Sequence, residues 1–126
     1  MDKKTINTPN APAAIGPYSQ AILAGDTLYC SGQIALDPAT GNLVMESIAA
    51  ETHQIMKNVI AVLEEAKMSL DNVVKCSIFM SSIDHYAAIN EVYSEYFQVN
   101  PPAREAVAVK TLPKEVNVEI SVIAVI

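Results

Sequence analysis

The sequence predicts a single α+β domain, in which one mixed β-sheet carries two helices packed on one face. A chain of 126 residues is long enough for one hydrophobic core and too short for two ordinary ones. Hydrophobic residues make up 51% of it, and no repeat or low-complexity tract interrupts them. Their spacing changes along the chain in the order strand, strand, helix, strand, helix, strand, strand. We therefore expect one folded domain over residues 1–126.

The first two strands follow a proline-containing arm. Residues 18–23 and 27–34 read as strands, and Ala24-Gly25-Asp26 between them is a turn sequence typical of a hairpin. Residues 37–42 are rich in Pro, Gly, Asp and Asn, which supply turn geometry. We expect a loop there.

Two helices are predicted in the middle of the chain. Apolar residues recur at helical spacing from Ser47, a suitable N-cap, to about residue 67, and this stretch lacks Gly and Pro. The spacing is helical again over residues 83–97, and Asn100-Pro101-Pro102 stops that helix. Residues 73–80 between the helices are apolar and rich in β-branched side chains, which indicates a strand.

Two further strands are predicted at residues 104–112 and 116–126. The brief turn at residues 113–115 predicts that they are antiparallel neighbours, which excludes a purely parallel sheet. The last strand is apolar on both of its faces, so the side of the sheet without helices needs a cover. Self-association is the simplest cover.

The composition argues against several classes of function. The formal net charge is -6 and the lysines are scattered, which disfavours nucleic-acid binding. No apolar run approaches the roughly 20 residues of a membrane span, and the N-terminal residues lack an apolar signal core. We therefore expect a cytoplasmic protein without a membrane partner.

Familiar catalytic motifs are absent. The sequence contains no HExxH, CxxC, GxxxxGK[ST], GxGxxG or GxSxG motif. We interpret His53 and His85 as surface or packing residues. Cys30 and Cys76 lie in apolar runs and are interpreted as inert thiols, with a disulfide or a reactive thiol as alternatives. We expect neither a metal nor a cofactor.

Two charged residues stand where packing does not require them. Arg104 is the only arginine and follows Pro101-Pro102 at the start of a strand. Its guanidinium suits the carboxylate of a small organic acid, and a structural salt bridge is the alternative. Glu119 interrupts the most apolar strand. Partial burial would raise its pKa and make it a proton acceptor near neutral pH, whereas an exposed position would give it no such role.

The sequence resembles the RidA/YjgF/L-PSP (Rid) family, with matching order and spacing from about residue 5 to the C-terminus. The resembling segments are residues 14–21 (AIGPYSQA), 29–34 (YCSGQI), 58–64 (NVIAVLE), 102–109 (PAREAVAV) and 112–120 (LPKEVNVEI). The resemblance implies a chorismate-mutase-like fold and a homotrimer whose sheets pack around a central axis, with ligand sites in the clefts between subunits. It also implies a deaminase that hydrolyses 2-iminobutanoate and 2-iminopropanoate, released by pyridoxal-phosphate-dependent dehydratases, to 2-keto acids and ammonia.

The resemblance further implies roles for individual residues. Arg104 would hold the substrate carboxylate, and Glu119 would position or activate the attacking water. The pocket would be shaped by Tyr18, Ser31, Gly32 and Asn90. Many family members follow the arginine with Ser-Cys, whereas this chain has Glu105-Ala106. Alternation places Ala106 on the Arg104 face of the strand and Glu105 on the other, where we expect it to add negative charge near the site entrance.

Two other functions stay open at this point. Relatives are described as endoribonucleases that inhibit translation, although the acidic chain offers no basic stripe for RNA. A non-enzymatic role, as a small-acid binding protein or a holdase, would use the same clefts or the surface.

Overall fold

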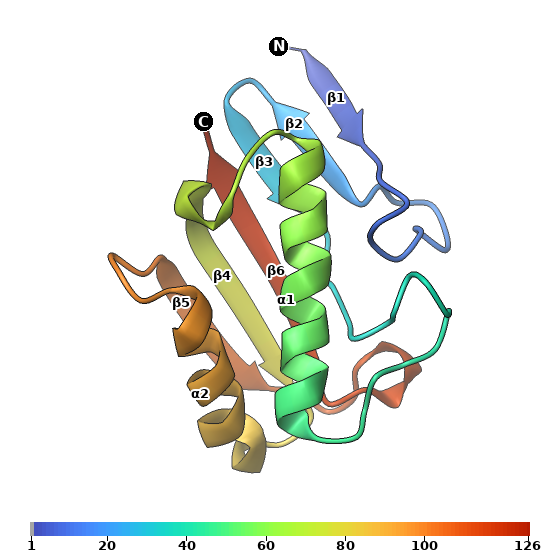
Figure 1. Ribbon diagram of the computed structural model, residues 1–126, viewed down its shortest axis with the longest axis vertical. Helices are drawn as coiled ribbons and strands as arrows, with labels where there is room; N and C mark the ends of the chain where they lie inside the picture. Colours follow the sequence, from blue (N-terminus) through green and yellow to red (C-terminus); the bar gives the residue numbers. More distant parts are fainter. Residues whose placement is uncertain (1) are drawn as a thin grey trace.

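The computed structural model describes residues 2–126, which form one six-stranded mixed sheet with two helices on one face (Figure 1). The strands are β1 (Lys3–Ile6), β2 (Ala21–Ala24), β3 (Thr27–Cys30), β4 (Val73–Met80), β5 (Ala103–Ala108) and β6 (Val118–Val125). Their order across the sheet is β1-β2-β3-β6-β4-β5. All neighbours are antiparallel except β4 and β5, which are parallel. The expected α+β fold is confirmed.

The last two strands are not neighbours, and the prediction that they pair is wrong. β4 lies between them, because Met80 pairs with Ala108 of β5 on one side and with Val118 of β6 on the other. The connection from β5 to β6 crosses the end of β4. There the Val109 N–H donates to the Met80 carbonyl at 2.9 Å. Adjacent strands are only about 4.8 Å apart, so a short connection can step over one strand as easily as it can turn a hairpin.

The two helices begin and end close to where their spacing predicts. α1 (Ile48–Glu65) is capped by the Ser47 hydroxyl, which accepts from the Ala50 N–H at 3.0 Å. α2 (Tyr86–Tyr96) follows a single 3₁₀ turn at Ile83–His85. Both helices cover the same face of the sheet (Figure 1).

The N-terminal arm contains a strand that the sequence pattern did not reveal. β1 pairs antiparallel with β2, from Lys3 opposite Ala24 to Ile6 opposite Ala21. Only Ile6 of its four side chains is buried. A strand whose side chains are mostly polar and exposed has no alternation to detect, and main-chain pairing defines it.

The two faces of the sheet differ in burial. Toward the helices, β4 and β6 contribute wholly buried side chains, including Ile78 and Ile120. The opposite face, called here the open face, is only half-buried and carries polar residues among the apolar ones. There Lys75 Nζ lies 3.0 Å from Glu105 Oε1, and the Ser77 hydroxyl donates to the same carboxylate. The charge that we expected Glu105 to add is therefore balanced by a neighbouring lysine.

The core lies between the helices and the sheet. Its centre is built from residues of α1, β4, α2 and β6 that have no more than 2% exposure, among them Ile55, Leu63, Met80 and Ile89. Within residues 2–126, neither helix has the length and the apolar character needed to cross a membrane.

Candidate functional site

Arg104 lies on the helix face of β5, where α2 holds its guanidinium. Nη1 donates to Asn90 Oδ1 at 2.7 Å, and Nη2 donates to the Tyr86 hydroxyl at 2.8 Å. The guanidinium carbon also lies 4.9 Å from the centre of the Tyr93 ring and 5.7 Å from that of Tyr86. All of these partners are neutral. In the part of the chain that the structure describes, Arg104 forms no ion pair, so the salt-bridge alternative is wrong for the single chain.

The surroundings of Arg104 combine a closed side and an open side. On the closed side Ala106, Ile78 and Ile89 lie next to Arg104. The gap that they leave has no room for a water molecule. The other side borders an open hollow of about 290 Å³, whose lining includes Asn90 and Ser94. The guanidinium is therefore reachable from solvent while its position is fixed by α2.

Tyr93 and Cys76 both lie next to Arg104. The Tyr93 ring faces the guanidinium, and Cys76 is the residue opposite Arg104 in the pairing of β4 with β5. The Tyr93 hydroxyl is buried and has no hydrogen-bond partner within residues 2–126. Burial raises the pKa of Tyr93, and the adjacent Cys76 thiol raises it further. Burial also raises the pKa of Cys76, and it raises that of Cys30 to about 12. Both thiols stay protonated near neutral pH, which supports their interpretation as inert.

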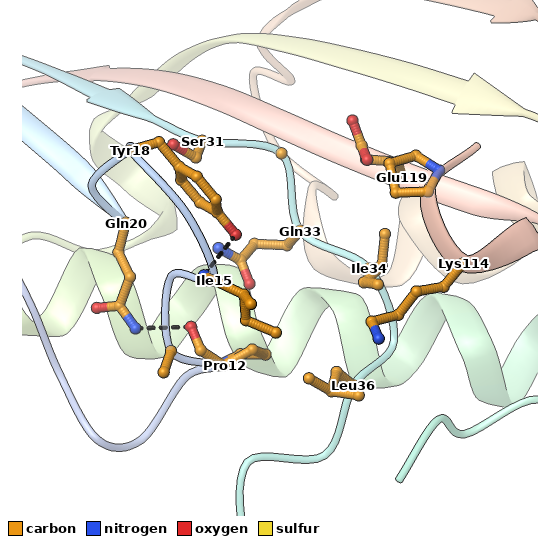
Figure 2. A pocket seen from close by; sticks show the side chains of 13 residues that line it. Pro12, Ile15, Tyr18, Gln20, Ser31, Gln33, Ile34, Leu36, Lys114 and Glu119 are labelled. Atoms are coloured by element: carbon orange, nitrogen blue, oxygen red, sulfur yellow. Dashed lines mark hydrogen bonds between the residues drawn. The ribbon is translucent and has the colours of Figure 1, made fainter. Parts of the chain in front are cut away.

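A second group of predicted residues lines a cavity of about 480 Å³ near the start of β6. Tyr18, Ser31, Gly32 and Glu119 all border it. Figure 2 shows the Tyr18 ring and the Glu119 carboxylate on its rim. Lys114, which the sequence placed only in a turn, also borders it, and its ammonium points toward Leu36 and away from Glu119 (Figure 2).

Glu119 is half-buried on the open-face side of β6. Burial raises the pKa of its carboxyl group above the ordinary value. No hydrogen bond or ion pair reaches this carboxylate within residues 2–126. Its chemistry is that of a carboxylate with a raised affinity for a proton and free lone pairs, the properties of a general base.

An irregularity in strand pairing at Ser31-Gly32 brings the backbone of Gly32 close to the Glu119 carboxylate. Tyr29 pairs with Ile123, yet Gln33 pairs with Ile120, so one strand advances four residues while the other advances three. The extra residue makes a β-bulge. A Cβ on Gly32 would lie 2.5 Å from Glu119 Oε2. Only glycine allows the backbone to approach the carboxylate so closely.

Buried amide side chains hold the loops around this cavity. Gln20 accepts from the Thr8 N–H at 2.7 Å and donates to the carbonyls of Thr8 and Pro12. Asn58 on α1 donates to the carbonyls of Ile34 and Leu36, at 3.0 and 2.9 Å. These contacts fix the arm and the strand extension that form two walls of the cavity.

Glu51 does the same for the connection that leads into β6. It is fully buried in the first turn of α1, and its carboxylate accepts from the N–H groups of Asn117 and Val118 at 2.9 and 3.0 Å. The Asn117 side-chain amide adds a third bond at 3.1 Å. Glu51 thereby fixes the chain two residues before Glu119.

The structure brings the predicted residues together in two groups rather than one. Arg104, Asn90 and Ala106 lie on the helix face, whereas Tyr18, Ser31, Gly32 and Glu119 lie around the second cavity. Strand pairing shows the separation directly. Arg104 is opposite Cys76 and Glu119 is opposite Phe79, and residues 76 and 79 of one strand point to different faces.

Comparison with known proteins places this arrangement in a family. A family model described as Endoribonuclease L-PSP matches residues 8–126. The 2-iminobutanoate/2-iminopropanoate deaminase of Bos taurus is 46% identical over 123 residues, which cover 98% of this chain and 90% of that protein.

Solved structures agree in fold over nearly the whole chain. A Yersinia pestis protein of the conserved Rid family, described as of unknown function, matches with a TM-score of 0.97 and 47% identity, covering 99% of this chain and 100% of that one. TdcF of E. coli, solved with bound serine, matches with a TM-score of 0.93 and 37% identity over 98% of each chain. The chain therefore belongs to the endoribonuclease L-PSP family, which is the Rid family that its sequence motifs resemble.

Proposed function

We propose that the protein is a hydrolase acting on C–N bonds, a 2-iminobutanoate/2-iminopropanoate deaminase. The observation that carries the proposal is the held but unneutralised guanidinium of Arg104, since Asn90 and Tyr86 accept its hydrogen bonds without cancelling its charge. Such a group is a ready partner for the carboxylate of a small organic acid. The deaminase name of relatives at 46% identity and the serine bound by TdcF support the same class of ligand.

The proposed reaction needs only positioning and one proton-transfer group. Water adds to the electrophilic imine carbon to give a carbinolamine, and the collapse of this adduct forms the 2-keto acid and expels ammonia. In the addition, Glu119 accepts a proton from the attacking water and gives it to the imine nitrogen. In the collapse, it accepts the proton of the carbinolamine hydroxyl and gives it to the departing nitrogen, which leaves as ammonia. Burial raises its pKa, which increases the affinity of the carboxylate for the protons that it accepts.

The separation of Arg104 and Glu119 supports an assembled site. A small imino acid spans only a few ångströms and cannot reach both faces of one sheet. We therefore propose a homotrimer in which Arg104, Asn90 and Ala106 of one subunit meet Tyr18, Ser31, Gly32 and Glu119 of the next, so that the 2-imino acid binds in the cleft between them. Exposed apolar residues of the open face, such as Tyr29 at 52% and Val107 at 42%, suit contact with other copies.

A coupled assay tests the proposed activity. A threonine dehydratase generates the imine, and the appearance of 2-ketobutanoate is timed with and without the protein. We expect acceleration at catalytic amounts. Binding of 2-ketobutanoate without acceleration would instead indicate a small-acid binding protein.

Sedimentation equilibrium tests the assembly. We expect the mass of three chains, and a monomer mass that does not change with concentration would rule out the shared cleft. In a monomer, one substrate molecule could not contact both Arg104 and Glu119, since the two residues lie on different faces of the sheet.

We do not propose an activity on RNA, although the family description names an endoribonuclease. RNA affinity depends on neutralising phosphates, and this chain has a net charge of -6 and dispersed lysines. We expect weak filter binding at low salt that disappears at physiological salt. Sub-micromolar affinity at physiological salt would reopen the nuclease function.

A further inference from the structure

Three side chains of α2 surround Arg104. The sequence predicts a role at the site for only one of them, Asn90. Tyr86, Asn90 and Tyr93 are spaced four and three residues apart, so they project from the same side of the helix. Both tyrosines fall in the apolar helical spacing of residues 83–97, which by itself predicts a packing role. Their shared spacing with a polar Asn90 was the signal that a binding face lies there.

We propose that Tyr86 and Tyr93 are positioning residues, which together with Asn90 clamp Arg104 in the orientation that receives the substrate carboxylate. This inference rests on the proposed function. Its first support is geometric, because the two terminal nitrogens of the guanidinium each donate to a different residue of α2, at 2.7 and 2.8 Å. Two such bonds fix the plane of the fork, which one bond could not do.

The second support is chemical. A guanidinium has five N–H groups, and the clamp uses one on each terminal nitrogen, so three remain for a ligand. The tyrosine rings attract the cation through their faces without supplying a negative charge. An acidic residue in place of Tyr86 would hold the fork equally well but would compete with the substrate carboxylate.

The third support is the side chain next to the clamp. Ala106 offers no polar group to Arg104, and the gap around it has no room for a water molecule. The Tyr86 hydroxyl is therefore the group that fixes the Nη2 side of the fork. A fork ordered in advance loses less conformational freedom when the substrate binds, and so binds it more tightly.

The test uses Tyr86→Phe, which keeps the ring and removes only the hydroxyl. The matched control is Tyr96→Phe on the same helix, since the Tyr96 hydroxyl bonds His53 at 2.7 Å and does not contact Arg104. Calorimetry measures the Kd of 2-ketobutanoate, the stable product of the proposed reaction, and the coupled assay measures kcat and KM. We expect Tyr86→Phe to weaken binding and raise KM roughly three- to tenfold, the size of one lost hydrogen bond, with kcat changed less than KM. The Tyr96→Phe variant should bind as the wild type does.

A double-mutant cycle shows whether Tyr86 acts through Arg104. In an Arg104→Lys background the fork is absent, so Tyr86→Phe should have no further effect on the Kd. An equal effect in both backgrounds, an unchanged Kd in the Arg104 background, or tighter binding by Tyr86→Phe would each overturn the clamp. A wild-type protein that neither binds 2-ketobutanoate nor accelerates imine hydrolysis would overturn the proposed function itself, which separates the two failures.

Discussion

Arg104 and Glu119, the two charged side chains of the proposed reaction, are prepared in opposite ways. Arg104 is held by two hydrogen bonds and two aromatic rings, all from neutral groups of α2. Glu119 is held by its strand and by partial burial, and within residues 2–126 nothing bonds its carboxylate. A group that binds a charge benefits from a fixed geometry. A group that must gain and lose a proton benefits from an environment in which neither form is strongly stabilised.

Removing the proton acceptor should give the largest effect. Glu119→Gln keeps the shape of the side chain and abolishes its basicity, so we expect turnover to fall by roughly 10²–10⁴-fold while the proposed trimer persists. Steady-state kinetics and sedimentation on the same sample measure both. Unchanged turnover would show that Glu119 has only a structural role and does not transfer a proton in the reaction.

Changing the fork should give the next largest effect. Arg104→Lys keeps the charge but loses the planar arrangement that α2 holds, so we expect kcat/KM to fall by about 10- to 100-fold, with a smaller loss of Tm than variants without the charge show. Arg104→Ala measured beside it shows how much of the loss is due to charge. If the lysine variant turns over at a near-native rate, charge alone is sufficient and the carboxylate clamp is wrong.

Displacing Glu119 without removing it should give an intermediate effect. Gly32→Ala adds a methyl group 2.5 Å from Oε2, and the carboxylate must move because it is the more flexible partner. We expect turnover to fall by about tenfold, as a misplaced general base would produce, with Tm nearly unchanged. Gly41→Ala is a matched control because a Cβ there meets no atom within 4 Å, although its positive φ of 78° makes that variant slightly less stable. Equal turnover in both variants would show that the position of Glu119 is not critical.

The elements of the fold could be predicted because their side chains carry the information. Apolar spacing located both helices and β4, and the Ser47 cap was visible as a residue type. The order of the strands was not visible, because the connection between β5 and β6 is equally compatible with a direct hairpin and with a step over β4. Only the packing of the whole sheet decides between them.

The site could be predicted residue by residue but not as a geometry. Arg104 and Glu119 stood out as charges in apolar strands, yet their separation on two faces follows from a register that alternation alone does not reveal. The buried supports Gln20, Glu51 and Asn58 were missed because a polar residue on a helix or in a loop looks exposed until its partners are known. Those partners are backbone groups that lie between 8 and 67 residues away in the sequence.

The smallest expected effect concerns stability and pH, and it separates the two residues once more. Burial raises the folded-state pKa of Glu119 above its value in the unfolded chain, about 4.3. The folded protein therefore binds more protons in the window between the two values, and stability falls as pH rises through that window. Above it the full cost is present, and Glu119→Gln removes it. We expect this variant to melt about 1–3 °C above the wild type at pH 7, since a half-exposed carboxyl group is partly screened, and to melt with it near pH 4.

Arg104→Gln should lower Tm at both pH values, because the guanidinium does not titrate and its contacts with α2 are lost at each. A wild type more stable than Glu119→Gln at pH 7 would mean that the assembled protein does bond this carboxylate, and the contrast between a held arginine and an unheld glutamate would then be wrong.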